Sequence, residues 1–587
     1  MTDNVLRHRR TGQPGRLAAA GVAMALAVGG GTIGYLELVG DDAGCTGEPV
    51  QLTVVASPDQ YPVLNRLVER WTAGQPDVDG RCVGAAVRSM PSSAVAASIG
   101  PGWDERRDGP RPDVWAPDFS AWLTLAAARP DAARVLPREA PPSLASSPAV
   151  IAMQRPMAEA LGWPGRALGW SDLIGGFAGG KTWAAYGHPE WGALRVGMVD
   201  PTKSGAGLVA AMTILDPNND QTMSDAELFG GLSLAQLTTL NVDDPADLLR
   251  AVGEPAPANS LPAAFPVLER ELAQYAAGSP PVPLVPVYPK EGLGYADYPY
   301  AILRGDWVDG VRQRAAADLL ESLRAADARR AYQEAGFRDP DHRAEASGPL
   351  AADRGFRTAL ATAPRALTGE SMTQLLGSWT VLQRPNNALL VLDVSGSMND
   401  VVPGTRQTRL QLVQRAASSG AGLLNNQTTV GLWAFATDLT PTTDYRELVA
   451  PGLAGEPVGG VPRRLAVIGA VQRLRAGGDT GLYDTVHAAY LRMQQAWQPN
   501  AQNVLVVMTD GKNEDEQGLT LAQLTARLRA AARPDRPLPV IGIACGPQAD
   551  AAALQQITQL TGGRTFIARD DVSAIQQIVL AFAGRIS

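Results

Sequence analysis

Five polar side chains in the C-terminal part of this 587-residue chain carry oxygen atoms that suit a hard divalent cation. In the run DVSGS, Asp393, Ser395 and Ser397 stand at alternate positions directly after an apolar stretch. Thr480 follows in GGDTGLYD, and Asp510 ends the run VLVVMTD. Carboxylate and hydroxyl oxygens with few charges suit Mg²⁺, which keeps several waters or takes an outside ligand. The pattern therefore predicts a site for Mg²⁺ or Mn²⁺.

A set of apolar strands would bring these side chains together. Amphipathic helical patterns, such as 409–424 and 520–532, separate the strands. Nearly continuous apolar strands divided by helices indicate a parallel sheet covered on both faces, and ligands bind such sheets at the carboxyl ends of the strands. We expect a doubly wound, mostly parallel α/β fold. Its predicted strands are 388–397, 429–436, 503–511, 538–545 and 564–569.

The metal pattern resembles the metal-ion-dependent adhesion site (MIDAS) of the von Willebrand factor A (VWA) domain. That site is Asp-x-Ser-x-Ser plus a Thr and an Asp from two later loops, and the resemblance covers about 386–587, with the domain itself expected over 388–587. It implies a Rossmann-like fold in which hydroxyl groups bind the metal directly and carboxylates act through water. It also implies a protein partner that supplies an Asp or Glu to the metal. The residues matched are Asp393, Ser395, Ser397, Thr480 and Asp510.

The segment 48–365 also alternates between strands and helices. A β-branched run at 51–57 predicts a buried strand, and Leu64, Leu67, Val68 and Trp71 then recur at helical spacing. About 310 residues of this alternation predict an α/β domain with two lobes. A stretch punctuated by Gly, Ser and Pro at 366–387 is predicted to be a linker. Further strands are expected at 82–90, 112–118, 148–154, 193–201 and 280–289.

Several phrases in this segment resemble bacterial extracellular solute-binding proteins of the two-lobed periplasmic type. They include LTVVASPDQYPVLNRLVERW, RPDVWAPDFSAWL, RVGMVDPTKSGAGLVAA and VYPKEGLGYADYPYAIL, and GFRDP at 336–340 would close the domain. The resemblance implies a small-molecule ligand in the N-terminal lobes. By the same analogy, Ser57 after the first strand and Ser147 before a later strand are candidate ligand-binding residues.

A physical argument adds Ser204 and Gly205 to these candidates. In DPTKSGAGL these residues open a helix directly after a strand, and free backbone amides there would bind an anion or a polar ligand group. For each serine, a role as helix N-cap or turn residue is the alternative. Both interpretations stay open at this point.

The apolar run at 17–39 is long enough to span a bilayer. Four arginines lie upstream of it, so we expect 1–16 to be a cytoplasmic basic tail and the bulk of the chain to be extracellular. A single-pass protein of the cell membrane is therefore predicted. A cleaved signal peptide is the rival interpretation of the same segment.

Composition excludes several classes of function. The net charge of −8 and the pI near 5.3 argue against a nucleic-acid partner. No histidine pair has the HExxH spacing and no GxSxG motif occurs, so we expect no enzymatic activity. Of three cysteines, Cys45 and Cys82 share a segment and are expected to pair, whereas Cys545 lies in an apolar run and is expected to be a buried thiol.

These observations predict a membrane-anchored extracellular binding or adhesion protein that captures a protein or ligand through its divalent metal. The alternative is a tethered substrate-binding receptor of an ABC-type importer, with the C-terminal domain as an accessory. An intracellular assembly factor of the chelatase type uses the same kind of metal site, but the predicted export of the chain argues against it.

Overall fold

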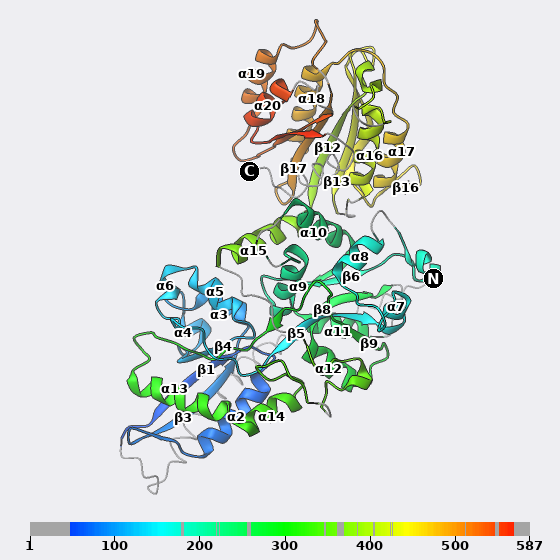
Figure 1. Ribbon diagram of the computed structural model, residues 1–587. Helices are drawn as coiled ribbons and strands as arrows, with labels where there is room; N and C mark the ends of the chain where they lie inside the picture. Colours follow the sequence, from blue (N-terminus) through cyan, green and yellow to red (C-terminus); the bar gives the residue numbers. More distant parts are fainter. Residues whose placement is uncertain are drawn as a thin grey trace, which may run out of the picture. The chain divides into compact units, whose positions relative to one another are not determined.

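The computed structural model describes residues 47–568 and shows a mixed α/β protein (Figure 1). By its internal contacts the chain divides into two compact units. The first comprises 1–118, 130–144 and 298–331, and the second comprises 119–129, 145–297 and 332–587. Gaps in the described range fall at 178–180, 219, 222–223, 255–259, 346–347, 361–368, 384, 403–405, 423, 425–426, 511 and 546–550.

The predicted membrane segment at 17–39 lies outside the described residues, as does Cys45. Among the residues that the structure describes, no helix combines the length and the apolar character needed to cross a membrane. Cys82 is disulfide-bonded, and Cys545 is a buried free thiol, as predicted.

The first unit is built on a five-stranded sheet in the order β11-β4-β1-β3-β2. The central strand β1 pairs in parallel with β3 and β4, and its Leu52 and Val54 side chains are fully buried. Helix α2 packs on β3, and Leu64, Leu67 and Val68 of the predicted stripe are buried, whereas Trp71 is only partly buried. The elements are β1 Val50–Ala56, α2 Tyr61–Ala73, β2 Asp77–Val78, β3 Arg81–Ser89, α3 Ser92–Ser98, α4 Glu105–Asp108, β4 Val114–Ala116, α6 Pro130–Ala133, β11 Ala301–Ile302 and α13 Gly310–Leu323, with α14 Ala326–Glu334 crossing into the second unit.

The described part of the second unit contains two six-stranded sheets and the two-stranded sheet β15-β16. The first six-stranded sheet has the order β10-β5-β8-β6-β7, with β9 also paired to β5. Strand β5 is buried along its whole length, so this strand is the centre of the sheet's core. The elements around it are α5 Ala121–Ala127, β5 Ser147–Gln154, α7 Arg155–Ala160, α8 Trp170–Phe177, η2 Trp183–Tyr186, η3 Pro189–Trp191, β6 Val196–Val199, α9 Gly205–Leu215, α10 Asp225–Leu237, β7 Thr238–Val242, α11 Pro245–Gly253, β8 Ala264–Leu268, α12 Glu269–Ala277, β9 Leu284–Val287, β10 Tyr295–Ala296 and η5 Ala352–Arg354.

A fully buried ion pair fastens the GFRDP segment to this sheet. Arg338 donates from Nε and Nη2 to the two carboxylate oxygens of Glu269 at 2.6 and 2.7 Å, and neither side chain is exposed. The hydroxyl of Tyr288 also donates to Glu269. Arg338 further donates from Nη1 to the carbonyl of His342 at 3.0 Å. The segment predicted to close the domain is therefore held by a buried ion pair in which both carboxylate oxygens of Glu269 accept hydrogen bonds.

The segment predicted to be a linker contains helix α15, Gly369–Gln383. Its Met372, Leu375 and Trp379 side chains are buried, at a spacing of three and four residues. This helical spacing of apolar residues outweighs the local Gly and Ser content, because burying an apolar stripe stabilises a helix more than propensity does. The next strand begins at Asn386, two residues before the predicted start of the C-terminal domain.

The C-terminal sheet has the order β14-β13-β12-β17-β18-β19. All neighbours pair in parallel except the edge strand β14, which is antiparallel, so the predicted mostly parallel sheet is present. Its elements are β12 Asn386–Asp393, η6 Gly396–Asn399, α16 Arg409–Gly422, β13 Thr429–Phe435, β14 Tyr445–Leu453, β15 Pro457–Val458, β16 Val461–Pro462, α17 Arg463–Gln472, α18 Leu482–Gln495, β17 Gln502–Thr509, α19 Leu521–Ala531, β18 Val540–Cys545, α20 Ala551–Leu560 and β19 Thr565–Ala568.

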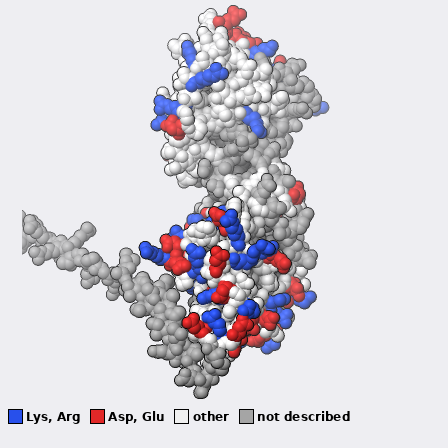
Figure 2. Space-filling view, turned by 90° about the vertical axis from the view of Figure 1, so that its left-hand side faces the viewer, with Lys and Arg blue, Asp and Glu red and all other residues white. Residues whose placement is uncertain are grey.

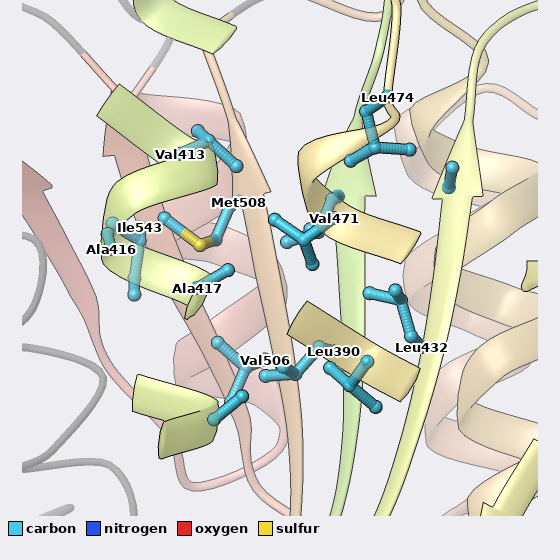
Figure 3. Close-up of a cluster of buried hydrophobic side chains, with 14 of the residues drawn as sticks. Leu390, Val413, Ala416, Ala417, Leu432, Val471, Leu474, Val506, Met508 and Ile543 are labelled. Atoms are coloured by element: carbon cyan, nitrogen blue, oxygen red, sulfur yellow. The ribbon is translucent and has the colours of Figure 1, made fainter. Parts of the chain in front are cut away.

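Helices cover both faces of this sheet (Figure 1). Successive side chains of β12 point to opposite faces, so Leu390 joins the core under α16 and α17 while Leu389 joins the core under α18, α19 and α20. Figure 3 shows the first core, where Met508 of β17 lies against Ala416 and Val413 of α16. Packing on both faces fixes the register of the strands, and therefore the positions of the residues at their ends.

Charged side chains of both signs are mixed on one face of the molecule. On the face shown in Figure 2, Lys and Arg alternate with Asp and Glu among the coloured residues. The visible face therefore lacks the excess of positive charge that nucleic-acid binding needs, and the net charge of −8 points the same way.

Candidate metal centre

The five predicted metal-binding residues lie at the carboxyl edge of the C-terminal sheet. Asp393 is the last residue of β12, and Asp510 directly follows β17, which pairs with β12 in parallel. Parallel neighbours end at the same edge of a sheet, so these two carboxylates emerge side by side. Ser395 is the N-cap of η6, Ser397 lies within η6, and Thr480 comes just before α18.

Hydrogen bonds connect four of the five residues. The backbone N–H of Ser395 donates to Asp393 Oδ1 at 2.8 Å, which fixes the turn after the strand. The hydroxyls of Ser395 and Ser397 are 3.1 Å apart, and the hydroxyl of Ser397 donates to Asp510 Oδ1 at 2.9 Å. Residues separated by more than 100 positions in the sequence thus form one continuous polar chain.

The loop that carries Thr480 contacts the segment of the two serines through its backbone. The backbone N–H of Gly396 donates to the carbonyl of Gly478 at 2.7 Å, and the N–H of Gly477 donates to the carbonyl of Val394 at 2.8 Å. The hydroxyl of Thr480 is fully buried and lies 3.4 Å from Glu514 Oε2. The loop of Thr480 is therefore packed directly on the loop that carries the two serines.

The carboxylates are removed from water. Asp393 is completely buried and Asp510 is 3% exposed. Burial raises the pKa of Asp393 to about 6, and the negative charge of Asp510 adds to this rise. Hydrogen bonds from Ser395 and from the hydroxyl of Thr509, at 2.5 Å, act in the opposite direction. A buried carboxylate with a raised pKa gains free energy when a cation arrives, because its charge is poorly solvated without one.

Arg409, the first residue of α16, also belongs to this centre and was not predicted. Its Nη1 lies 2.6 Å from Asp510 Oδ2, with only 9% of its side chain exposed. The same atom lies 3.4 Å from Asp400 Oδ2. A single arginine at the start of an amphipathic helix gives no spacing signal that relates it to the DVSGS run, so sequence patterns alone could not find it.

The donor set fits a hard divalent cation. Three hydroxyl oxygens and two carboxylates lie on segments that meet at one sheet edge, and among these residues Asp393, Ser395 and Thr480 are fully buried. Oxygen ligands of this kind are those that Mg²⁺ and Mn²⁺ prefer.

A second acidic group lies in the same domain. Asp444, Asp484 and Asp515 place carboxylate oxygens within 4.8 Å of one another. Each also accepts a backbone N–H, from Asp438, Leu519 and Gln517 respectively. This group provides a natural comparison for any experiment on cation binding.

In the first unit, the predicted ligand-binding residue Ser57 is buried and has internal partners. Its hydroxyl donates to Asp59 Oδ1 at 2.5 Å and accepts from Gln60 Nε2 at 3.2 Å. The hydroxyl of Tyr298 donates to the other carboxylate oxygen of Asp59. Ser57 therefore takes part in a hydrogen-bond network that braces the end of β1.

In the second unit, Ser147 and Ser204 lie on different elements. Ser147 begins β5, is 1% exposed, and accepts the backbone N–H of Arg270 at 3.2 Å. Ser204 is the N-cap of α9, but its side chain makes no capping hydrogen bond, and its N–H donates to the carbonyl of Asp200 at 3.0 Å. The amide of Ser204 is thus already bonded, whereas Gly205 opens the helix as predicted.

The geometry of α9 explains one glycine in the DPTKSGAGL run. A Cβ atom at Gly207 would lie 2.5 Å from the carbonyl oxygen of Val199 in β6. The helix can therefore leave the strand this tightly only because that position has no side chain.

Comparison with known families agrees with both predicted resemblances. Residues 52–338 match the family model of the bacterial extracellular solute-binding protein, and residues 387–581 match that of the von Willebrand factor type A domain. The chain therefore combines a solute-binding-like part with a VWA part. These two matches support an extracellular binding protein, and they are consistent with a small-molecule ligand for the first part and a protein interaction for the second.

Two uncharacterized proteins of Mycobacterium tuberculosis, from strains CDC 1551 and H37Rv, resemble this chain over most of its length. Each is 24% identical over 528 residues, which covers 89% of this chain and 74% of the relative. Both parts of the chain thus recur together in these relatives.

Solved structures resemble the two parts separately. A von Willebrand factor type A protein from Catenulispora acidiphila is 24% identical, with a TM-score of 0.27, over 34% of this chain and 42% of that one. The periplasmic binding protein AfuA from Actinobacillus pleuropneumoniae is 13% identical, with a TM-score of 0.40, over 57% of this chain and 98% of that one.

Proposed function

We propose that this chain is an exported, non-enzymatic binding protein whose VWA part captures an acidic group of a protein partner through Mg²⁺ or Mn²⁺. The observation that supports this most is that Asp393, Ser395, Ser397 and Asp510 are linked by hydrogen bonds at one sheet edge, against which the loop of Thr480 packs. A bound cation would supply an open coordination position for the partner's carboxylate.

The residues of the centre would have two different roles in binding the ion. The hydroxyls of Ser395, Ser397 and Thr480 would hold the ion, and Asp393 and Asp510 would hold its waters. Both carboxylates already have fixed orientations, because Thr509 donates to Asp393 and Arg409 donates to Asp510. Outer partners of this kind orient the groups that face a metal.

Isothermal titration of Mg²⁺ and Mn²⁺ into the full chain tests this function. Asp393→Ala should lower the affinity by about 100-fold or more, because it removes a buried carboxylate from the centre. Asp515→Asn is the matched control, since it neutralises one carboxylate of the other acidic group. Binding that survives Asp393→Ala but is lost in Asp515→Asn would place the cation at the other group and refute the proposal.

Anchoring in the membrane is part of the same proposal. Residues 17–39 would span the bilayer once, with the N-terminus inside and the two binding parts outside. Protease treatment of intact cells tests this topology. Degradation of the VWA part while the N-terminal tail stays protected is expected, and full protection of the chain would contradict it.

A role as the tethered receptor of an ABC-type importer is the second candidate, and the match of residues 52–338 to the solute-binding family supports it. Thermal-shift screening of the full chain against oxyanions and sugars separates the two functions. A specific ligand of micromolar affinity that Asp393→Ala leaves unchanged would favour transport. If no compound in the panel shifted the melting temperature, adhesion would be favoured.

A further inference from the structure

The contact between Arg409 and Asp510 places a positive charge inside the candidate metal centre. Nη1 of the Arg409 guanidinium lies 2.6 Å from Asp510 Oδ2. The hydroxyl of Ser397 donates to Oδ1, the other oxygen of the same carboxylate. Arg409 Nε is buried and has no hydrogen-bond partner among the described residues. An arginine in such a position is held by the charge of Asp510 more than by complete hydrogen bonding.

The charge balance of the centre follows from these contacts. Asp393 and Asp510 are negative when ionised and Arg409 is positive, which leaves one net negative charge. A divalent cation would turn this into one net positive charge. Without Arg409 the loaded centre would be neutral. Because charges in buried surroundings interact far more strongly than in water, this difference must act on both the cation and any later ligand.

We propose that Arg409 is a positioning residue that fixes Asp510, weakens the binding of the divalent cation, and leaves the loaded site positive so that an acidic ligand is needed to hold the metal firmly. This inference rests on the proposed function of the same centre. It makes metal and carboxylate binding mutually dependent, as expected of a site that should stay weakly loaded until its partner arrives.

Among the described residues, Asp400 and Glu514 also contact this centre, and both have smaller effects. Asp400 lies 3.4 Å from Arg409, but 66% of its side chain is exposed, so water screens its charge. Glu514 is exposed and contacts the hydroxyl of Thr480 at 3.4 Å. Asp400 nevertheless offsets part of the charge of Arg409, which makes it a useful second position to test.

Titration of Mg²⁺ alone into the full chain, followed by calorimetry, measures the effect of Arg409. Arg409→Gln should tighten Mg²⁺ binding by about tenfold or more, because the competing charge is gone. Arg409→Lys keeps the charge and should restore an affinity within about threefold of wild type. A residue with a purely structural role would weaken the binding when replaced, so the direction of the change is decisive.

Asp400→Asn keeps the proposal testable if Arg409→Gln does not fold. This surface substitution removes a charge that offsets Arg409, and it should weaken Mg²⁺ binding by about twofold to threefold. Adding acetate as a minimal carboxylate should tighten Mg²⁺ binding to wild type more than to Arg409→Gln. Tighter binding in Asp400→Asn, or an equal acetate effect in both proteins, would overturn the proposal.

The outcomes also separate this inference from the proposed function. Unchanged or weaker Mg²⁺ binding in Arg409→Gln, beside clear binding in wild type, would overturn the role of Arg409 alone. Absence of binding in wild type, Arg409→Gln and Asp400→Asn would overturn both. Binding in Arg409→Gln but not in wild type would support the effect of Arg409 while refuting metal capture by the native chain.

Discussion

Two regions of the molecule bury carboxylates beside an arginine, and they use them differently. In the solute-binding-like part, Arg338 and Tyr288 donate to both oxygens of Glu269, and the pair is fully buried. In the VWA part, Arg409 contacts only one oxygen of Asp510, while the buried Asp393 has no arginine of its own among its hydrogen-bond partners in the described residues. The first region has balanced charges and the second has an excess of negative charge.

The difference indicates how a buried charge that serves stability can be told from one that serves binding. A balanced pair with complete hydrogen bonds has no further need of a partner. The candidate metal centre combines an unbalanced charge with hydroxyls on Ser395, Ser397 and Thr480, whose oxygens retain lone pairs. Burial with unmatched charge, more than burial alone, is therefore the feature that makes this centre a candidate for binding.

Breaking the balanced pair should give the largest effect. Glu269→Gln leaves Arg338 buried without its counter-charge, so we expect the free energy of unfolding to fall by about 3–5 kcal/mol. Scanning calorimetry of the full chain would show this as a lower melting temperature for a transition that Mg²⁺ does not shift. Asp341→Asn is the control, because Asp341 pairs with Arg343 on the exposed surface.

The apolar double variant Glu269→Leu with Arg338→Met sharpens the same test. Replacing both charges removes the unpaired arginine, and stability should return to near that of wild type. If Glu269→Gln weakened Mg²⁺ binding as well, the two regions would be coupled. The Glu269–Arg338 pair would then not serve stability alone.

Removing one hydroxyl from the unbalanced centre should have a smaller effect of a different kind. Thr480→Ala should weaken Mg²⁺ binding by about tenfold, because it deletes an oxygen that would face the ion. Thr480→Ser keeps this oxygen and should restore the affinity measured by calorimetry. Equal losses in both variants would mean that the methyl group and its packing, not the hydroxyl, account for the effect.

Much of the VWA part was predictable from sequence because its strands are apolar on both faces. The predicted strand 429–436 corresponds to β13, and 538–545 corresponds to β18, with ends that differ by at most two residues. The rule that parallel strands share a carboxyl edge then brought Asp393 and Asp510 together. The positions of these two carboxylates follow from the order and direction of the strands.

Other features depend on contacts that local patterns do not contain. Strand β8, Ala264–Leu268, escaped prediction because Pro266 stands in its middle, where proline usually argues against a strand. Arg409 and Asp510 are 101 residues apart, and only the packing of α16 on the sheet sets their distance. The bonded amide of Ser204 likewise follows from the turn at Asp200 and not from the DPTKSGAGL run itself.

The smallest expected effect concerns Ser57, whose hydroxyl has internal partners as in the balanced region. Ser57→Ala should lower the stability of the first unit by about 1 kcal/mol, because Asp59 loses one hydrogen bond. The N–H of Gln60 and the hydroxyl of Tyr298 still donate to Asp59, which keeps the loss small. Ser322→Ala on the exposed surface of α13 is the control and should not destabilise the protein. Calorimetry that found Ser57→Ala as stable as wild type would show that this hydroxyl is not needed for the fold, and would return Ser57 to the candidates for ligand binding.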